Sequence, residues 1–256
     1  MSSLTVPRRS VSKLIAMLFD QYVYPPYDTP LLEAFGARFE SLYVVFHPFI
    51  RMPEEFSWRL IRRYPDDSEI LSRGARCTWS EVAAQTGMGA CARLNQALLT
   101  SIGAVADYLC DYSARDKLQQ FLQSSSVWMP VEGRFEPMLH AELLHAFESA
   151  GDAELIHVPE FPQKDPIQAL PVAGLKDHTV PFPSCGSLVA PDQSFLFTVD
   201  WDSFFTLFYG PRSFVDRVIR EYSIEGFFAT PTTEHAWFNY SFGCATVTLS
   251  PEHWPA

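Results

Sequence analysis

Two carboxylates and one histidine in the C-terminal half are, by residue type and spacing, the best candidates for catalytic or metal-binding side chains. Asp200 and Asp202 lie on either side of Trp201, so in a continuing strand their side chains would share one face. Paired carboxylates can hold a metal ion or divide the roles of general acid and general base. His235 follows Glu234 in a hydroxyl-rich loop and could act as a general base. One functional hypothesis is therefore a hydrolase or metal-dependent enzyme that uses Asp200, Asp202 and His235.

The motifs that would give such a base a reaction are missing from the sequence. There is no nucleophile elbow, glycine-rich phosphate loop or dinucleotide fingerprint. His140 and His145 are five residues apart, so on a helix their rings would point about 140° apart and would not share a zinc ion. Carboxylates at the end of a hairpin usually cap the turn and face water. The sequence therefore favours a non-catalytic protein, and it predicts no metal and no cofactor.

The elements that must position these side chains form the densest apolar stretch of the chain, residues 187–237. Residues 195–199 and 204–209 are rich in aromatic and β-branched side chains, and the polar break between them predicts an antiparallel hairpin. A Gly-Pro pair ends the second strand, and the apolar spacing over residues 211–222 predicts an amphipathic helix that packs on the hairpin. Residues 226–229 predict a further short strand.

The N-terminal half has mainly helical patterns. Helices are expected from a cap at Thr78 or Ser80 to Gly87, and over residues 90–109, 114–122 and 137–150. The unbroken apolar run at residues 42–46 predicts a strand that is buried on both faces. Together the patterns predict an α+β fold with a mainly helical N-terminal half and a C-terminal antiparallel sheet with a packed amphipathic helix.

The proline-rich segment 159–183 predicts an irregular connection, which is either a linker or a long loop packed on the domain. The part of the chain after it is too short to bury a core independently. We therefore expect one composite domain over residues 1–256, helix-rich over 1–150 and sheet-containing over 151–256.

The composition favours the cytoplasm. No apolar run reaches the eighteen residues of a membrane span, and the N-terminal apolar segment is short and lacks a cleavage site. The five cysteines are odd in number and have no CxxC spacing, which is typical of free thiols in a reducing compartment. We therefore expect neither membrane insertion nor secretion.

Charge is unevenly distributed along the chain. Residues 1–128 carry 13 Lys and Arg against 13 Asp and Glu, whereas residues 129–256 carry 6 against 17, so the second half holds the whole net charge of −11. An acidic half disfavours nonspecific binding to nucleic acid and favours a basic protein partner, although the same charge can serve solubility alone. Arg59, Arg62 and Arg63 form either a local basic patch or a solvated helix face.

One N-terminal segment has the order of a helix-turn-helix. In EVAAQTGMGACARLNQAL, a helix, a glycine turn and a second helix would place Arg93 and Asn95 early in a recognition helix. That helix carries one Arg and no Lys, whereas DNA affinity depends mainly on cations that contact phosphates. A DNA-binding regulator and an ordinary helical hairpin both fit the pattern, and the charge favours the hairpin.

The segments SFLFTVDWDSFFTLFYG and EGFFATPTTEHAW, in this order, resemble a group of uncharacterised bacterial proteins that includes immunity-protein-like families of toxin systems. TWSEVAAQTGM, LLTSIGAVADYL and the run His47-Pro48-Phe49 are similar to segments of one such domain family of unknown function. The resemblance implies a non-enzymatic protein that binds and blocks a toxin, with its acidic half steering a basic partner. The contact residues that it implies are Asp200, Trp201, Asp202, Glu234, His235 and Trp237.

Overall fold

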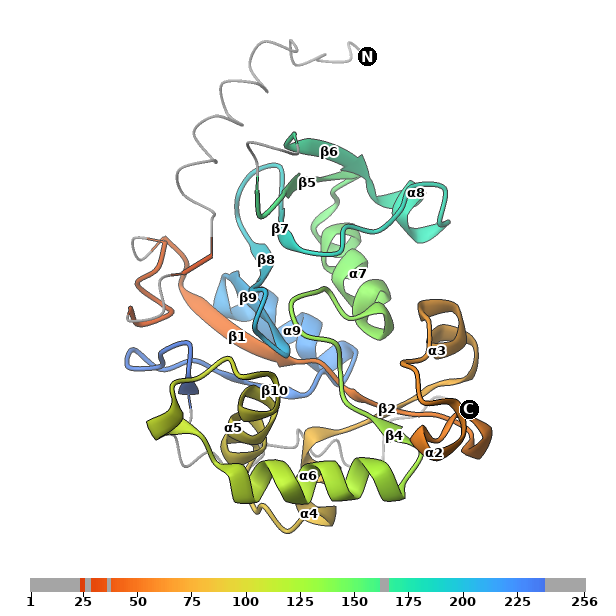
Figure 1. Cartoon of the computed structure of the whole chain (residues 1–256). Coiled ribbons are helices and arrows are strands. Elements are labelled where there is room, and N and C mark those ends of the chain that lie inside the picture. Colours follow the sequence, from red (N-terminus) through yellow and green to blue (C-terminus); the bar gives the residue numbers. More distant parts are fainter. Residues whose placement is uncertain (1–23, 26–28, 36–37, 162–165, 238–256) are drawn as a thin grey trace, which may run out of the picture.

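The computed structural model describes residues 24–25, 29–35, 38–161 and 166–237. In this part of the chain the central element is a seven-stranded sheet whose neighbouring strands are all antiparallel (Figure 1). Its strands in spatial order are β10 (Gly226–Phe228), β1 (Ser41–Phe46), β9 (Phe205–Gly210), β8 (Leu196–Val199), β7 (Gly186–Val189), β5 (Glu154–Val158) and β6 (Gln168–Pro171). β1 thus lies between two strands from the C-terminal half, and the prediction of one composite domain stays a prediction.

Helices cover both faces of this sheet. The first face carries α4 (Trp79–Gln85), α5 (Cys91–Ile102) and α6 (Tyr112–Ser124), and the second carries α7 (His140–Ala150), α8 (Val172–Lys176) and α9 (Arg212–Glu221). Side chains alternate along a strand, so Val44 of β1 packs with the first set of helices, and Tyr43 and Val45 pack with the second. Burial on both faces explains the apolar run of β1. The predicted α+β fold is confirmed.

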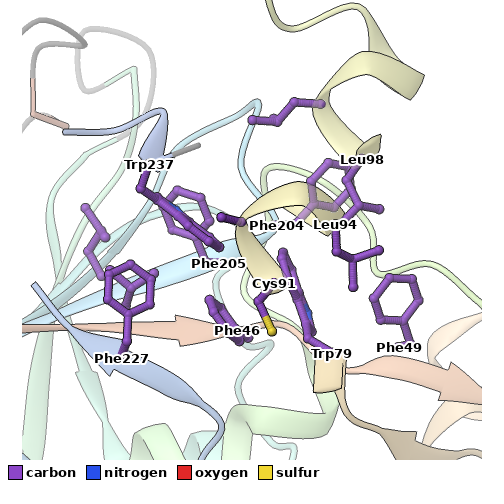
Figure 2. Packing of buried hydrophobic residues seen from close by; sticks show 14 of the residues in the cluster. Phe46, Phe49, Trp79, Cys91, Leu94, Leu98, Phe204, Phe205, Phe227 and Trp237 are labelled. Carbon is purple, nitrogen blue, oxygen red and sulfur yellow. The ribbon is translucent and has the colours of Figure 1, made fainter. Parts of the chain in front are cut away.

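Aromatic rings from distant parts of the chain fill the core under α4 and α5 (Figure 2). Phe46 of β1 stacks on Trp79 of α4, with ring centroids 4.4 Å apart, and on Trp237, 5.4 Å away. The Trp79 indole N–H donates to the His47 carbonyl oxygen at 2.7 Å, so the polar atom of this buried ring is satisfied. Trp237 is 1% exposed, and the polar loop that leads to it is therefore anchored in the core.

A three-stranded antiparallel sheet follows directly from β1 and supports a smaller apolar cluster. Its strands in spatial order are β3 (Ala75–Cys77), β2 (Phe49–Arg51) and β4 (Val127–Trp128). The helices α2 (Trp58–Ile61) and α3 (Asp67–Arg73) lie next to it (Figure 1). The cluster consists of Ile50, Met52, Phe56, Ile70 and Trp128. Because two residues separate β1 from β2, the main sheet fixes the position of the small one.

The predicted C-terminal elements are confirmed with small shifts. β8 and β9 form the expected antiparallel hairpin, and α9 follows Pro211, which is its N-cap residue. The helix expected over residues 90–109 is shorter, because α5 ends at Ile102, where Gly103 takes a left-handed conformation with φ 72°. A glycine terminates the helix here before the apolar pattern ends.

The proline-rich segment 159–183 contains regular structure. It includes β6, which pairs with β5, and α8, which follows β6 directly. Among its residues that the structure describes, 159–161 and 166–183, the buried side chains are Pro159, Leu170, Val172 and Leu175. The segment is therefore packed on the domain and is not a linker.

The cysteines and the helix lengths bear on the predicted compartment. Cys77 and Cys110 are free thiols, but Cys91 is disulfide-bonded, so the expectation of free thiols is wrong at Cys91. Cys244 lies outside the described residues. None of the helices in the described ranges is long and apolar enough to cross a bilayer. The cytoplasmic location stays a prediction.

Candidate functional site

The turn between β8 and β9 positions the candidate carboxylates. One carboxylate oxygen of Asp200 accepts the N–H of Trp201 at 2.9 Å, which is the turn-capping role expected at a hairpin end. The Ser203 hydroxyl lies 2.9 Å from the Asp200 carbonyl oxygen and donates to it. Gly133 passes directly behind the turn, and its N–H donates to the Ser203 carbonyl oxygen at 3.0 Å. Trp201 and its neighbours are therefore held from inside by backbone hydrogen bonds.

Gly133 also allows a close approach of its backbone to the turn. Its backbone is left-handed, with φ 70°, and a Cβ at this residue would lie 2.7 Å from the Cα of Trp201 and would overlap its carbonyl oxygen. Only glycine permits this approach without strain.

Asp200 and His235 form a buried pair under the turn. A carboxylate oxygen of Asp200 lies 3.5 Å from Nε2 of His235, and the two side chains are almost inaccessible to solvent. The imidazole also packs edge-on against Tyr24, 5.2 Å between centroids, and in a tilted arrangement against Phe205, 5.5 Å away. Burial lowers the pKa of His235 to about 3, so the ring is neutral at pH 7. A neutral imidazole is the form that can accept a proton.

Two small cavities adjoin this pair, one lined in part by His235 and the other in part by Asp200. One has a volume of about 180 Å³ and is lined mainly by apolar side chains from the end of α5 and the segment after it, with Asp202 and His235 as its ionisable residues. The other has a volume of about 210 Å³, and its lining includes Asp200, Trp201 and Glu160. Both are smaller than typical small-molecule sites, which occupy roughly 300–1,000 Å³. Each cavity therefore has room for one side chain or a small ligand.

Asp202 is the carboxylate of this group that a ligand can reach. It is partly exposed, whereas Asp200 is buried. Desolvation and the nearby carboxylate of Glu132 raise the pKa of Asp202 above its ordinary value. A cation placed between Asp202 and Glu132 would relieve their mutual repulsion, which favours binding of a positively charged group.

The structure separates the six predicted contact residues into two sets. Trp201 is 63% exposed, Glu234 is exposed and Asp202 is partly exposed. Asp200, His235 and Trp237 are buried, so they have no surface to offer a partner in this conformation and instead support the exposed set. This burial could not be predicted from the local pattern, because the loop PTTEHAW is polar and its partners Phe46 and Tyr24 lie far away in the chain.

Three residues that sequence reasoning missed extend the exposed set. Phe161 is 55% exposed and lines the 210 Å³ cavity together with Glu160 and Trp201. Glu132 lies close enough to Asp202 to shift its pKa. We call Glu132, Glu160, Phe161, Trp201 and Asp202 the acidic aromatic surface. A Glu-Phe pair directly after a strand was the available signal, but only the fold brings it beside Trp201.

The described residues do not supply the ligands of a metal-dependent enzyme. No group of three or more His, Cys, Asp or Glu side chains in this part of the chain is placed to hold a metal ion. His140 stacks on Phe182 and His145 packs on Tyr222, so these two rings occupy separate environments, as their spacing predicted. Asp200 and Asp202 therefore keep two candidate roles, acid–base chemistry and the binding of a positively charged group.

The predicted recognition helix lies in the core. Asn95 of α5 is fully buried, and Arg93 is engaged by Asp111, with 2.9 Å between Nε and a carboxylate oxygen. A helix that is buried along most of its length cannot enter a DNA groove. The structure therefore favours the ordinary helical hairpin of α4 and α5.

Comparisons with known proteins place the chain among uncharacterised proteins. A family model described as "Protein of unknown function (DUF2711)" matches residues 27–239. The chain is also similar to "Uncharacterized protein YwbB" of Bacillus subtilis (strain 168), at 24% identity over 229 residues that cover 85% of this chain and 98% of that protein. No solved structure matches the chain. These matches confirm the expected bacterial family of unknown function.

Proposed function

The chain belongs to the DUF2711 family of proteins of unknown function, and we propose that it acts as a non-catalytic module that binds a basic protein through the acidic aromatic surface. The observation that carries the proposal is an exposed indole, Trp201, set between carboxylates on a turn that is anchored in the core. The proposed partner contacts are the members of this surface, of which the sequence predicted Trp201 and Asp202, together with the exposed Glu234, which the sequence also predicted.

The chemistry of this surface suits a lysine or arginine side chain. Trp201 and Phe161 offer two large exposed rings, and a cation over the face of such a ring is stabilised by about 0.5–2 kcal/mol. Glu160 in one cavity and Asp202 in the other each offer carboxylate oxygens that can accept charge-assisted hydrogen bonds from a cationic side chain. The 210 Å³ cavity has room for the end of one such side chain.

Long-range charge supports the same proposal. The net charge of −11 arises entirely in the half of the chain that contains this surface. Such a field speeds the encounter with a basic partner and disfavours acidic ones. A basic toxin is the partner class that agrees with the resemblance to immunity-type families, and neutralising it would require no catalysis.

Differential affinity capture from the native host tests the proposal. The wild-type chain and the double variant Trp201→Ala/Asp202→Asn serve as baits, with Tyr112→Ala/Asp116→Asn on α6 as a matched aromatic and acidic control. We expect a basic protein that the wild type and the control retain and the Trp201 variant loses. The captured basic protein, once purified, should bind the Trp201→Ala/Asp202→Asn variant at least about ten-fold more weakly than the wild type. The reason is that contacts at the centre of an interface carry most of its affinity.

The outcome that contradicts this proposal is a partner that all three baits retain equally, or binding that is insensitive to salt. Salt screens exposed charges. A basic partner that is attracted by the negative charge of this half must therefore associate more slowly at high ionic strength.

A second candidate function is an acid–base enzyme that uses Asp200, Asp202 and His235. It is favoured by the cavity in which Asp202, with its raised pKa, and the neutral imidazole of His235 both line the wall. Turnover of a small substrate that is abolished by Asp202→Asn and by His235→Gln, in variants that remain folded, would establish this function in place of the binding role.

A further inference from the structure

A second pair of cavities lies in the N-terminal half, between α2 and the C-terminal end of α6. The larger cavity has a volume of about 400 Å³, within the usual range for small-molecule sites. It is lined by Trp58, Tyr64, Gln119, Leu122, Gln123, Val127, Trp128 and Met129. None of these residues belongs to the acidic aromatic surface.

The walls of this cavity present apolar ring surface in a fixed arrangement. The Trp128 ring is contacted edge-to-face by Trp58, 5.5 Å between centroids, and by Tyr64, 5.6 Å away. The Trp128 indole N–H donates to the Phe56 carbonyl oxygen at 2.9 Å, and the Tyr64 hydroxyl donates to the Met129 carbonyl oxygen at 2.9 Å. Because the protein already satisfies these polar groups, the cavity favours a flat apolar body.

Two arginines line the adjoining cavity. This space of about 330 Å³ is lined by Trp58, Arg59, Arg62 and Gln123, so it shares two residues with the larger one. Nε of Arg59 donates to the Gln123 carbonyl oxygen at 3.0 Å, which holds the guanidinium against the end of α6. Arg62 caps α2 in a left-handed conformation.

These two guanidinium groups differ from the arginines around them. Arg63 pairs with Glu69, and Arg73 pairs with Glu55. Arg59 and Arg62 form no ion pair with any carboxylate of the described ranges. They therefore keep donors available for an anion, in a protein whose net charge is strongly negative.

We propose that the two cavities form one binding site for an amphiphilic organic anion, with a flat apolar body against the Trp58 and Trp128 rings and a carboxylate at Arg59 and Arg62. We call it the aromatic–arginine groove, defined by Trp58, Arg59, Arg62, Gln123 and Trp128. The apolar wall selects the body of the ligand, and the guanidinium pair selects its charge and orientation.

Isothermal titration calorimetry with 2-naphthoate and the neutral 2-naphthylmethanol tests the site. We expect saturable binding of the carboxylate, about ten-fold weaker binding after Arg62→Gln, and a further loss in Arg59→Gln/Arg62→Gln, because hydrogen bonds to charged groups carry about this much affinity. The alcohol should bind at least about ten-fold more weakly than the carboxylate and should be insensitive to the arginine changes. Trp58→Ala should weaken both probes.

Arg217→Gln on α9 is the matched control, because it removes an exposed arginine from the opposite face of the main sheet. Absence of saturable naphthoate binding at millimolar concentration would overturn the proposal, as would equal binding by wild type and the double arginine variant. An acidic, tryptophan-containing peptide is titrated in parallel. Tight binding of this peptide without naphthoate binding would make the occupant a protein segment and would also overturn the proposal.

Discussion

The acidic aromatic surface and the aromatic–arginine groove both place a tryptophan at the protein surface, but they surround it with opposite charge. Trp201 is 63% exposed and has Asp202 and Glu160 beside it, whereas Trp58 is 45% exposed and has two arginines beside it. The first residue lies on a tight turn of the main sheet, and the second lies on a one-turn helix next to the small sheet.

This difference shows that an exposed ring does not by itself indicate a ligand. The sign of the flanking charges and the shape of the adjoining cavity decide which class of molecule fits. The net charge of −11 does not reveal this difference in local charge. The N-terminal half has no net charge, yet it places two arginines that form no ion pair within the described ranges, Arg59 and Arg62, beside one cavity.

The largest expected effect is on the free energy of unfolding, and it distinguishes the buried tryptophan of the groove from the exposed tryptophan of the acidic aromatic surface. Trp128→Ala removes the floor of the groove, a ring that is 6% exposed, and should lower the free energy of unfolding by about 3–5 kcal/mol. Trp201→Ala should change it by less than about 0.5 kcal/mol, because this ring is mostly in solvent. Urea denaturation measures both. Equal losses in the two variants would show that Trp201 is structural and would remove the contrast.

A smaller effect is expected at the residue that supports the acidic aromatic surface. Gly133→Ala must adopt a left-handed backbone and displace the backbone of Trp201, which should destabilise the fold by about 2–3 kcal/mol and weaken partner binding. Gly103→Ala is the matched control, because Gly103 has φ 72° but open space at the Cβ position, so it should cost only about 1 kcal/mol. Naphthoate binding to the groove should survive both changes. Similar losses for the two glycines would show that the turn is not held by close contact.

The smallest effect concerns pH, and the part of it that comes from His235, one of several buried groups with a shifted pKa, lies under the acidic aromatic surface. The pKa of His235 is about 3 in the folded protein and 6.5 in the reference state, so the unfolded chain binds more protons between these values. Its contribution to stability is complete above pH 6.5 and is lost as pH falls towards 3. Between pH 6 and pH 5 this amounts to about 1 kcal/mol.

Urea denaturation of His235→Gln at these two pH values checks this expectation. The variant should lose about 1 kcal/mol less than the wild type on acidification, since one titrating group is gone. Trp58→Ala in the groove should keep the wild-type dependence. An unchanged pH dependence in His235→Gln would mean that this imidazole is accessible or already protonated.

Local patterns were sufficient for the elements that frame the acidic aromatic surface. The hairpin, α9 and β1 each have a periodicity, a turn or a helix start within their own residues, and the structure confirms them. The turn-capping role of Asp200 also follows from its neighbours alone.

Long-range pairing explains what the sequence patterns missed. β6 lies in a proline-rich segment and becomes a strand because β5 supplies its hydrogen bonds. The burial of His235 and Trp237 depends on Asp200 and Phe46, which are distant in the chain. The groove was visible only as an arginine cluster, because its aromatic floor, Trp128, comes from β4 and its Gln123 comes from α6. Arg63 of that cluster is neutralised by Glu69, and no spacing rule distinguishes it from Arg62.

The position of β1 between β9 and β10 has a consequence for how the molecule is made. A ribosome releases this strand early and its two neighbours late, so most of the chain must be translated before the sheet can close around it. Until Gly226–Phe228 emerges, one edge of an apolar strand stays open to other molecules. The last part of the sheet to be synthesised thus protects the first.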